Sequence, residues 1–262
     1  MRKEKASVIS TESLAENIYS IRLKTDIAGK SKAGQFVLVF PNDRSRLLGR
    51  PICVCEADGN KKELRIVFRI SGEGTKEFSG LKTGDTVNIE GPLGNGYDIG
   101  IAKGKKVLLI GGGVGAPSLL QLANELKDSG PESITAVLGY RDDSLKTFLS
   151  DDFRSSCDRV IIATDDGSSG IHGNVVDAVK AEDPEADLIY SCGPLPMLKA
   201  VSGYASDKGI EAYISLEERM ACGVGVCLGC VVETVEKDEH SQVNNARICK
   251  EGPVFKASEV RL

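Results

Sequence analysis

Four cysteines near the C-terminal end constrain the structure of this chain more than any other feature of its sequence. They are separated by four, two and eighteen residues: Cys222, Cys227, Cys230 and Cys249. This is the plant-type spacing of four thiolates that hold a [2Fe–2S] cluster. The glycines between the first three cysteines allow a short loop to wrap such a cluster and to direct backbone N–H groups at its sulfur atoms. We therefore predict a cluster-binding segment over residues 217–262.

A structural zinc site is the main alternative for these thiolates. Zinc sites built from four cysteines usually contain two C-x2-C pairs, whereas this region contains one such pair, Cys227 and Cys230. The spacing therefore favours iron and sulfide. The other four cysteines are predicted to be small apolar residues in buried segments: Cys53, Cys55, Cys157 and Cys192. The two histidines, His172 and His240, are expected at the surface.

Composition and charge narrow the class of protein. Of the 262 residues, 41% are hydrophobic and 27% are charged, which is ordinary for a chain that buries a core and unlike a disordered chain. With 33 basic and 38 acidic residues the net charge is −5, and no basic block occurs, so nucleic acid is not an expected partner. No apolar run approaches the roughly 20 residues of a membrane span, and no apolar signal region follows the first five residues. We expect a cytoplasmic protein without membrane contact, in which thiols stay reduced.

The first 101 residues are predicted to form short strands separated by turns. Runs rich in β-branched and aromatic residues alternate with Gly, Asn, Asp and Pro. The runs cover residues 37–40, 52–55, 64–70 and 86–89. Strands of this length and spacing are typical of a small antiparallel barrel or sandwich. We predict an antiparallel β barrel over residues 1–101.

The pattern changes after residue 101. Residues 107–110 are a continuous apolar run, as in a parallel strand that is covered on both faces. Apolar residues at helical spacing follow over 119–126, and Gly130-Pro131 is a stop signal. The same alternation repeats with strands at 134–138, 160–163, 188–190 and 212–216, and with helices around 175–180 and from residue 195. It predicts an α/β doubly wound nucleotide-binding domain over residues 102–216.

A glycine-rich loop joins the first strand and the first helix of this domain. It satisfies G-x-G-x-x-A, with Gly111, Gly112, Gly113 and Gly115. Missing side chains let a pyrophosphate approach the backbone, and the helix N-terminus supplies unpaired N–H groups. The loop therefore predicts a dinucleotide site, and a glycine-rich turn without a ligand is the alternative.

The residues that follow the next two strands bear on the identity of the dinucleotide. Arg141 is followed at once by Asp142 and Asp143, and this local charge disfavours the 2′-phosphate of NADP, although no acidic ribose ligand precedes Arg141. Asp165 follows the third strand, where the ligand crevices of such sheets open, so it is a candidate cofactor ligand. It can equally belong to a turn with Asx capping. We predict NAD rather than NADP.

Five short motifs occur in a fixed order along the chain. They are Arg50-Pro51-Ile52, residues 72–75, residues 91–94, the glycine loop and Cys192-Gly193-Pro194. This order is typical of the ferredoxin–NADP reductase superfamily, which the chain resembles. With the C-terminal cysteines included, the chain resembles the electron-transfer subunits of two-subunit, NAD-linked dihydroorotate dehydrogenases over essentially its whole length. Residues 217–230 are the most specific part of that resemblance.

The resemblance implies that the barrel binds FAD and that the α/β domain binds NAD. Arg50 would face a flavin phosphate, and Cys53 stands where the family has a hydroxyl residue beside the flavin ring. Gly74 and Thr75 would contact the pyrophosphate at a helix start. The residues that match the family's cofactor motifs outside the glycine loop are Arg50, Pro51, Ile52, Cys53, Val67, Phe68, Arg69, Gly74, Thr75, Cys192, Gly193 and Pro194.

The resemblance also implies a function. Electrons from dihydroorotate would reach FMN on a catalytic partner subunit, cross the [2Fe–2S] cluster and FAD of this chain, and leave on NAD, in pyrimidine (UMP) biosynthesis. The complex would be a heterotetramer with two copies of each subunit, and no catalytic acid or base would lie in this chain. Related flavin and iron–sulfur subunits of sulfhydrogenases and of NADH–ferredoxin transhydrogenases are the first alternative. A non-redox, zinc-dependent interaction module is the second.

Overall fold

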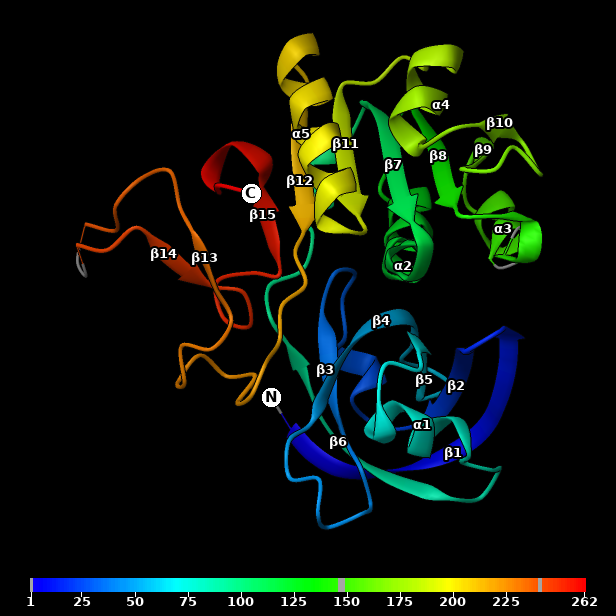
Figure 1. Cartoon of the computed structure of the whole chain (residues 1–262), viewed down its shortest axis with the longest axis vertical. Helices are drawn as coiled ribbons and strands as arrows, with labels where there is room; N and C mark the ends of the chain where they lie inside the picture. Colours follow the sequence, from blue (N-terminus) through cyan, green and yellow to red (C-terminus); the bar gives the residue numbers. More distant parts are fainter. Residues whose placement is uncertain (1, 146–148, 240–241) are drawn as a thin grey trace.

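Residues 2–145, 149–239 and 242–262 are described by the structure, a computed structural model. In this part of the chain, strands and helices form a closed barrel, a larger sheet covered by helices, and a small two-stranded sheet near the C-terminus (Figure 1). The predicted combination of a β barrel, an α/β domain and a C-terminal cysteine segment is confirmed. His172 is exposed as predicted, whereas His240 lies outside the described residues.

The barrel is closed by six antiparallel strands in the described residues. In barrel order they are β1 (Arg2–Ala15), β2 (Ile18–Lys24), β5 (Glu63–Arg69), β4 (Arg50–Asp58), β3 (Phe36–Phe40) and β6 (Thr86–Leu93). Strands β3, β4, β5 and β6 were each predicted from the sequence. Strands β1 and β2 were not predicted, and in β1 polar side chains interrupt the apolar pattern.

Helix α1 (Glu73–Ser79) follows β5 and closes one end of the barrel. Its start is fixed by Thr75, whose Oγ1 accepts hydrogen bonds from the backbone N–H groups of Ser71 at 2.9 Å and Gly72 at 3.2 Å. Phe78 of α1 is buried and contacts Phe68 of β5 edge to face, with ring centroids 6.1 Å apart. Phe78 therefore holds the buried face of α1 against the barrel core.

The second sheet has seven strands within the described residues. Their order is β10 (Ile171–His172), β9 (Arg159–Thr164), β8 (Ser133–Tyr140), β7 (Lys106–Gly112), β11 (Leu188–Cys192), β12 (Glu211–Ser215) and β15 (Val254–Lys256). All neighbours are parallel except β15, which pairs antiparallel with β12. The strand order reverses between β7 and β11, because β8, β9 and β10 follow on one side of β7 and β11 and β12 on the other. Doubly wound sheets bind ligands at this switch point.

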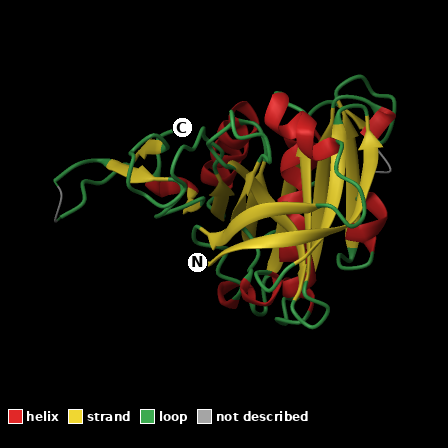
Figure 2. Ribbon diagram, turned by 90° about the horizontal axis from the view of Figure 1, so that it is seen from below, coloured by secondary structure: helices red, strands yellow, loops and turns green. Residues whose placement is uncertain are grey.

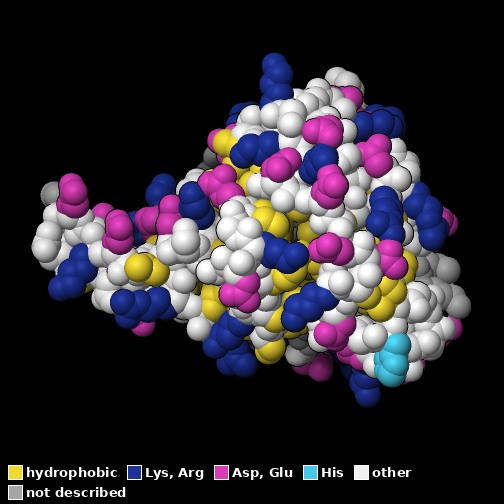
Figure 3. All heavy atoms as spheres, turned by 90° about the horizontal axis from the view of Figure 1, so that it is seen from above, with side chains coloured by type: hydrophobic (Ala, Val, Ile, Leu, Met, Phe, Trp, Pro, Cys, Tyr) yellow, Lys and Arg dark blue, Asp and Glu magenta, His cyan; other side chains and the backbone are white. Residues whose placement is uncertain are grey.

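The sheet is covered by α2 (Ala116–Lys127), α3 (Ser150–Arg154), α4 (Val175–Glu182) and α5 (Leu195–Lys208). Short 3-10 turns complete the described elements: Ala28–Lys30, Gly100–Ala102, Gly113–Gly115, Asp143–Leu145 and Ala257–Glu259. None of the helices in the described part of the chain is long and apolar enough to cross a membrane. On the face seen in Figure 3, cationic and anionic side chains are interspersed and do not gather into one broad patch of a single sign.

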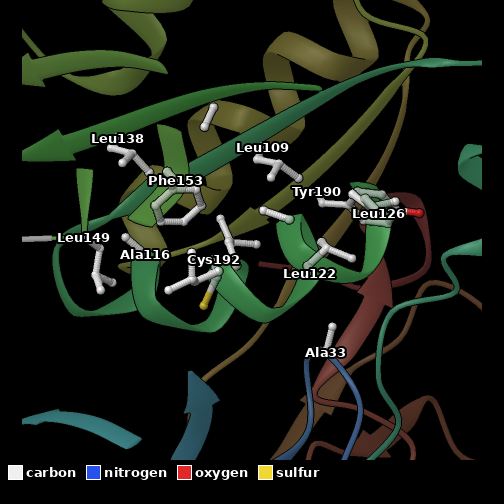
Figure 4. Packing of buried hydrophobic residues seen from close by; sticks show 14 of the residues in the cluster. Ala33, Leu109, Ala116, Leu122, Leu126, Leu138, Leu149, Phe153, Tyr190 and Cys192 are labelled. Atoms are coloured by element: carbon white, nitrogen blue, oxygen red, sulfur yellow. The ribbon is translucent and has the colours of Figure 1, made fainter. Parts of the chain in front are cut away.

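One hydrophobic core joins the barrel to the α/β domain. Leu119, Leu122 and Leu126 of α2 are fully buried among residues of the sheet and of the barrel (Figure 4). Two polar contacts reinforce this packing, because the Gln121 side chain accepts a hydrogen bond from Ala57 N at 2.8 Å and Glu125 accepts one from Ala33 N at 3.0 Å. Helix α2 thus fixes the orientation of the two domains.

The C-terminal segment projects from this body as a hairpin of β13 (Val231–Glu233) and β14 (Asn245–Arg247), which Figure 2 shows in profile. Its base is anchored on the barrel, since Ile248 and Cys249 pack in one cluster with Phe36 and Leu38 of β3. Its last strand, β15, extends the α/β sheet. This strand was not predicted, because three residues are too few to show a period.

Candidate functional site

A cleft of about 1060 Å³ lies between the barrel, the start of α2 and the segment that leads to the cysteines. This volume is large enough for a dinucleotide-sized cofactor. The lining residues are Phe36, Ser45, Arg46, Leu47, Leu48, Gly49, Arg50, Pro51, Ile52, Cys53, Val67, Phe68, Arg69, Ser71, Thr75, Val114, Pro117, Leu216, Glu217, Glu218, Arg219, Met220 and Pro253. Eight of the predicted cofactor residues lie in this lining: Arg50, Pro51, Ile52, Cys53, Val67, Phe68, Arg69 and Thr75.

Gly74 lies directly behind Arg50. A Cβ atom at Gly74 would be 2.5 Å from Arg50 Nε and 2.7 Å from Arg50 Cζ, so any side chain there would displace the guanidinium. Arg50 Nη1 also donates to the carbonyl oxygen of Leu48. The glycine therefore lets a fixed cation lie against the start of α1, where it borders the cleft.

The cleft also has a rim and an opposite wall that the sequence analysis missed. Leu47 and Leu48 of the β3–β4 loop are 82% and 53% exposed, so apolar side chains stand open at the rim. Residues 216–220 form the wall across from the barrel. Glu217 lies in this wall, where desolvation raises the pKa of its carboxyl group. The only sequence signal for this wall is its position directly before Cys222.

The glycine loop meets the Cys192-Gly193-Pro194 motif at the switch point of the sheet. A Cβ atom at Gly115 would be 2.7 Å from the Cys192 carbonyl oxygen and 2.7 Å from Gly193 Cα. A Cβ atom at Gly112 would be 2.5 Å from Met197 Sδ. Close packing against the backbone after β11 therefore requires Gly115 whether or not a ligand is bound, whereas a side chain at Gly112 would have to displace the flexible Met197 side chain of α5.

The remaining two glycines of the loop differ in their surroundings. Gly111 faces α2, because its Cβ would lie 3.0 Å from Ala116 Cα. Gly113 has a φ of +53° and open space where a side chain would be, so its backbone faces outward. Val114 and Pro117, which flank the helix start, line the cleft. The loop therefore borders the cleft through residues that the glycine motif does not specify.

Asp165 lies in a turn at the carboxyl edge of the sheet and is exposed. Its backbone N–H donates to Tyr140 O at 3.0 Å. The next residue, Asp166, forms an Asx turn by accepting from Ser168 N at 2.9 Å. Asp165 shares this sheet edge with the glycine loop, but it does not line the cleft.

The scattered cysteines occupy buried or half-buried positions, as predicted. Cys55 and Cys192 are fully buried, and Cys53 and Cys157 are partly buried. Burial raises the pKa of the Cys192 thiol to about 12, so this thiol stays protonated at neutral pH. Cys53 lines the cleft through the same strand as Arg50.

The four clustered cysteines are brought together as two thiol pairs. Cys222 and Cys227 interact with one another through their side chains, and so do Cys230 and Cys249. Among the described residues, no three His, Cys, Asp or Glu side chains are arranged to hold a single metal ion. Cys249 also interacts electrostatically with Cys222, so the two pairs adjoin one another.

Backbone N–H groups point at the sulfur atoms of these pairs. Cys222 Sγ accepts from the amides of Val224 at 3.5 Å, Val226 at 3.3 Å and Cys227 at 3.4 Å. Cys249 Sγ accepts from the Gly225 amide at 3.1 Å. Burial of Cys222 opposes ionisation, but the amide hydrogen bonds outweigh it and lower the pKa of this thiol to about 6. The loop thus favours a thiolate at Cys222.

The two pairs differ in exposure. Cys227 is exposed and is flanked by Val226 and Leu228, which are 79% and 62% exposed, whereas Cys230 and Cys249 are buried against β3. Gly223 is packed so tightly that its Cβ would lie 2.7 Å from Leu38 Cδ1. One side of the four-cysteine cluster therefore faces solvent, and the other side faces the barrel close to the cleft.

Comparisons with known proteins agree with this geometry. Residues 217–261 match the family model described as the iron–sulfur cluster binding domain of dihydroorotate dehydrogenase B. The chain is 41% identical over 261 residues to the electron transfer subunit of dihydroorotate dehydrogenase B (NAD(+)) from Streptococcus mutans, covering 99% of this chain and 98% of that protein. It is 40% identical to the corresponding subunit of Listeria innocua, with full coverage of both chains.

Solved structures share this fold over most or all of the chain. An NADH-dependent reduced ferredoxin–NADP oxidoreductase superimposes with a TM-score of 0.86 and 28% identity, covering 98% of this chain and 89% of that one. A ferredoxin NADP+ reductase from Neisseria gonorrhoeae superimposes with a TM-score of 0.65 at 13% identity, covering 84% and 94%. The second likeness concerns the fold alone.

Proposed function

The chain belongs to the family of electron transfer subunits of dihydroorotate dehydrogenase B (NAD(+)), and we propose that it binds FAD, NAD and a [2Fe–2S] cluster to perform this role. It is a subunit of an NAD-dependent flavoprotein oxidoreductase of pyrimidine biosynthesis. The proposal assigns each cofactor to residues on the basis of the cleft, the glycine loop and the thiol pairs.

The backbone amides directed at Cys222 and Cys249, within a plant-type cysteine spacing, are the observation that carries the cluster assignment. A [2Fe–2S] cluster takes two thiolates on each iron, so the pairs Cys222–Cys227 and Cys230–Cys249 fit one iron each. Amide groups directed at Cys222 and Cys249 suit sulfur atoms that carry negative charge. A single zinc ion would need all four thiols around one point. We therefore favour [2Fe–2S] over a structural zinc site.

FAD is assigned to the cleft. Arg50, oriented by Gly74 and Leu48, supplies a fixed cation for the flavin phosphates, and the strand residues Val67 and Phe68 supply an apolar surface for the ring. Arg69 and Arg219 add cations on either side of the cleft. When bound, a flavin exchanges a hydride with nicotinamide and single electrons with an iron–sulfur cluster. The protein contributes the position and surroundings of these groups, and no acid–base residue of this chain is required.

NAD is assigned to the carboxyl edge of the sheet beside the glycine loop. Gly113 has free space there, and the loop adjoins both Cys192-Gly193-Pro194 and the cleft. Asp165 follows the third strand at the same edge and is proposed as a further ligand. The relatives carry NAD(+) in their names, which supports NAD over NADP for this chain.

Dihydroorotate oxidation is assigned to an FMN-containing catalytic subunit, in a cytoplasmic complex with two copies of each chain. The exposed apolar residues Val226 and Leu228 flank exposed Cys227, so we propose that this surface contacts the catalytic subunit. The division into residues 1–101, 102–216 and 217–262 follows the three cofactors, with β15 as the part of the last segment that joins the α/β sheet.

Cofactor analysis of anaerobically purified protein tests the proposal. We expect about two iron atoms, two sulfides and one FAD per chain. One zinc ion with no iron or sulfide in protein reconstituted with iron and sulfide would instead support the zinc module.

Co-purification distinguishes the redox alternatives. An FMN-containing barrel subunit is the expected partner, and the mixture should oxidise dihydroorotate with NAD while this chain alone should not. A hydrogenase or transhydrogenase catalytic subunit in its place would favour the alternative subunits, and the NADH-dependent reduced ferredoxin–NADP oxidoreductase, at 28% identity, is one structural relative that supports testing them.

A further inference from the structure

Arg247, the last residue of β14, is hydrogen-bonded to the backbone of the cysteine loop. Its Nη1 donates to the carbonyl oxygen of Gly225 at 2.8 Å. Its Nε, at 2.9 Å, and its Nη2 donate to the two carboxylate oxygens of Glu251. The Arg247 backbone N–H also donates to Glu251 at 2.7 Å. The two-point ion pair fixes the guanidinium plane, so that its remaining nitrogen is directed at Gly225.

Gly225, which accepts this hydrogen bond from Arg247, is also the residue whose amide donates to Cys249. Gly225 N–H donates to Cys249 Sγ at 3.1 Å, and Gly225 C=O accepts from Arg247. Gly225 has a φ of +84°, and a Cβ atom there would lie 2.9 Å from Lys250 Cβ. Glycine is required for this close approach, but its backbone is also the least constrained of any residue. An external contact is therefore needed to hold its N–H in one direction.

We propose that Arg247 is a positioning residue that keeps the Gly225 N–H on Cys249 Sγ and thereby raises the reduction potential of the cluster. This inference rests on the proposed [2Fe–2S] cluster. A reduced cluster carries one more negative charge than an oxidised one, so a hydrogen bond to a ligand sulfur stabilises the reduced form. Arg247 acts on the cluster through the Gly225 backbone.

Loss of the Arg247 charge is an alternative explanation for a changed cluster potential. The structure allows this effect to be tested separately from the loss of the hydrogen bond to Gly225. Arg247 and Glu251 form a pair with no net charge. Replacing Arg247 alone would leave the Glu251 carboxylate without its partner, and this negative charge would itself disfavour cluster reduction. The double replacement Arg247→Gln and Glu251→Gln removes both charges together. It removes the two-point ion pair between Arg247 and Glu251 and the guanidinium that donates to Gly225, while leaving the net charge unchanged.

The test is an anaerobic redox titration of the complex with its catalytic subunit, followed by the electron paramagnetic resonance signal of the reduced cluster. In the double variant we expect the equilibrium between oxidised and reduced cluster to shift about tenfold toward the oxidised form, which is a potential about 59 mV lower for one electron. The matched control is Arg261→Gln with Glu233→Gln, an exposed ion pair of the same segment. Its potential should equal that of the unmodified protein.

The outcomes separate this inference from the proposed function. Absence of iron, sulfide and the resonance signal from the unmodified protein would reject the cluster itself. A double variant that keeps iron and sulfide and titrates at the unmodified potential overturns the role of Arg247, even if Arg247→Gln alone titrates lower. Arg247→Lys provides a second variant if the double variant does not load the cluster. Lysine keeps the charge but lacks the planar fork, so we expect a lower potential, and an unchanged potential contradicts the proposal.

Discussion

Helix α2 follows a short glycine-rich stretch and the cysteine loop contains one, yet the two regions are held in place by different forces. The apolar face of α2 is fully buried, with Leu119, Leu122 and Leu126 in the core shared by the two domains. The cysteine loop instead exposes Val226 and Leu228, and consecutive amides of the loop donate to sulfur atoms. Burial of apolar surface holds α2 in place. The conformation of the cysteine loop depends instead on its cysteine sulfur atoms and on the cofactor that they bind. The domains should therefore be stable without the cluster, whereas the loop should depend on it.

The largest expected effect is loss of the cluster in Cys227→Ser. One iron would lose a thiolate, while the cleft, which has other lining residues, would remain intact. We expect iron and sulfide content to fall below about one tenth of that of the unmodified protein, with FAD content largely retained. Iron and sulfide assays and flavin absorbance measure both quantities in the same sample. Cys157→Ser is the control, because Cys157 lies in the α/β domain, away from the thiol pairs. Joint loss of FAD through unfolding would contradict the separate stability of the two regions.

Core packing provides the next largest effect. Leu122→Ala removes a fully buried side chain of α2 and should lower the free energy of unfolding by about 2–5 kcal/mol. Val243→Ala in the projecting segment, where the side chain is 43% exposed, should change it by less than about 0.5 kcal/mol. Urea unfolding followed by far-ultraviolet circular dichroism compares the two variants. Equal shifts would show that the C-terminal segment contributes to stability as much as α2 does.

A smaller effect is expected at the cleft from Gly74→Ala. The new Cβ would lie 2.5 Å from Arg50 Nε, so the guanidinium must move away from the start of α1. We expect the dissociation constant of FAD to rise about 10–100-fold, with unchanged iron content. Gly72→Ala is a matched control, since its φ of 172° is extended backbone and no atom lies within 4 Å of its Cβ position. Equal FAD affinity of both variants would exclude the placement of a flavin phosphate at Arg50.

The same division explains what the sequence could predict. Strand β7 and α2 were predicted because their apolar periods arise from burial along continuous segments. The four cysteines were predicted because ligation requires a fixed spacing. The cleft wall at residues 216–220 and the strand β15 were missed, because both arise when segments distant in sequence meet in the fold. The glycine motif was only partly informative: Gly115 is required by packing against the backbone of Cys192 and Gly193, and among the glycines of the loop only Gly113 has open space beside it.

The smallest expected effect concerns the choice of dinucleotide at the edge of the α/β sheet. Asp142 lies beside Arg141 and is close enough to Asp166 for their charges to interact. Hydrogen bonds from Ser144 lower the pKa of Asp142, so this carboxylate stays ionised at neutral pH. A 2′-phosphate bound by Arg141 would therefore meet fixed negative charge. We expect kcat/KM with an artificial electron acceptor to be at least about tenfold higher for NADH than for NADPH, or roughly 1.4 kcal/mol.

This preference should respond to charge in a defined direction. Because the lowered pKa keeps Asp142 charged and a phosphate monoester is almost fully ionised above about pH 7, the ratio of the two kcat/KM values should stay constant between about pH 7 and pH 8. Asp142→Asn should reduce the ratio severalfold by improving the use of NADPH, whereas Asp207→Asn on the exposed face of α5 should leave it unchanged. Equal rates with NADH and NADPH in the unmodified protein would place the ribose away from the residues that follow β8. The dinucleotide would then have to be assigned to another part of the sheet edge.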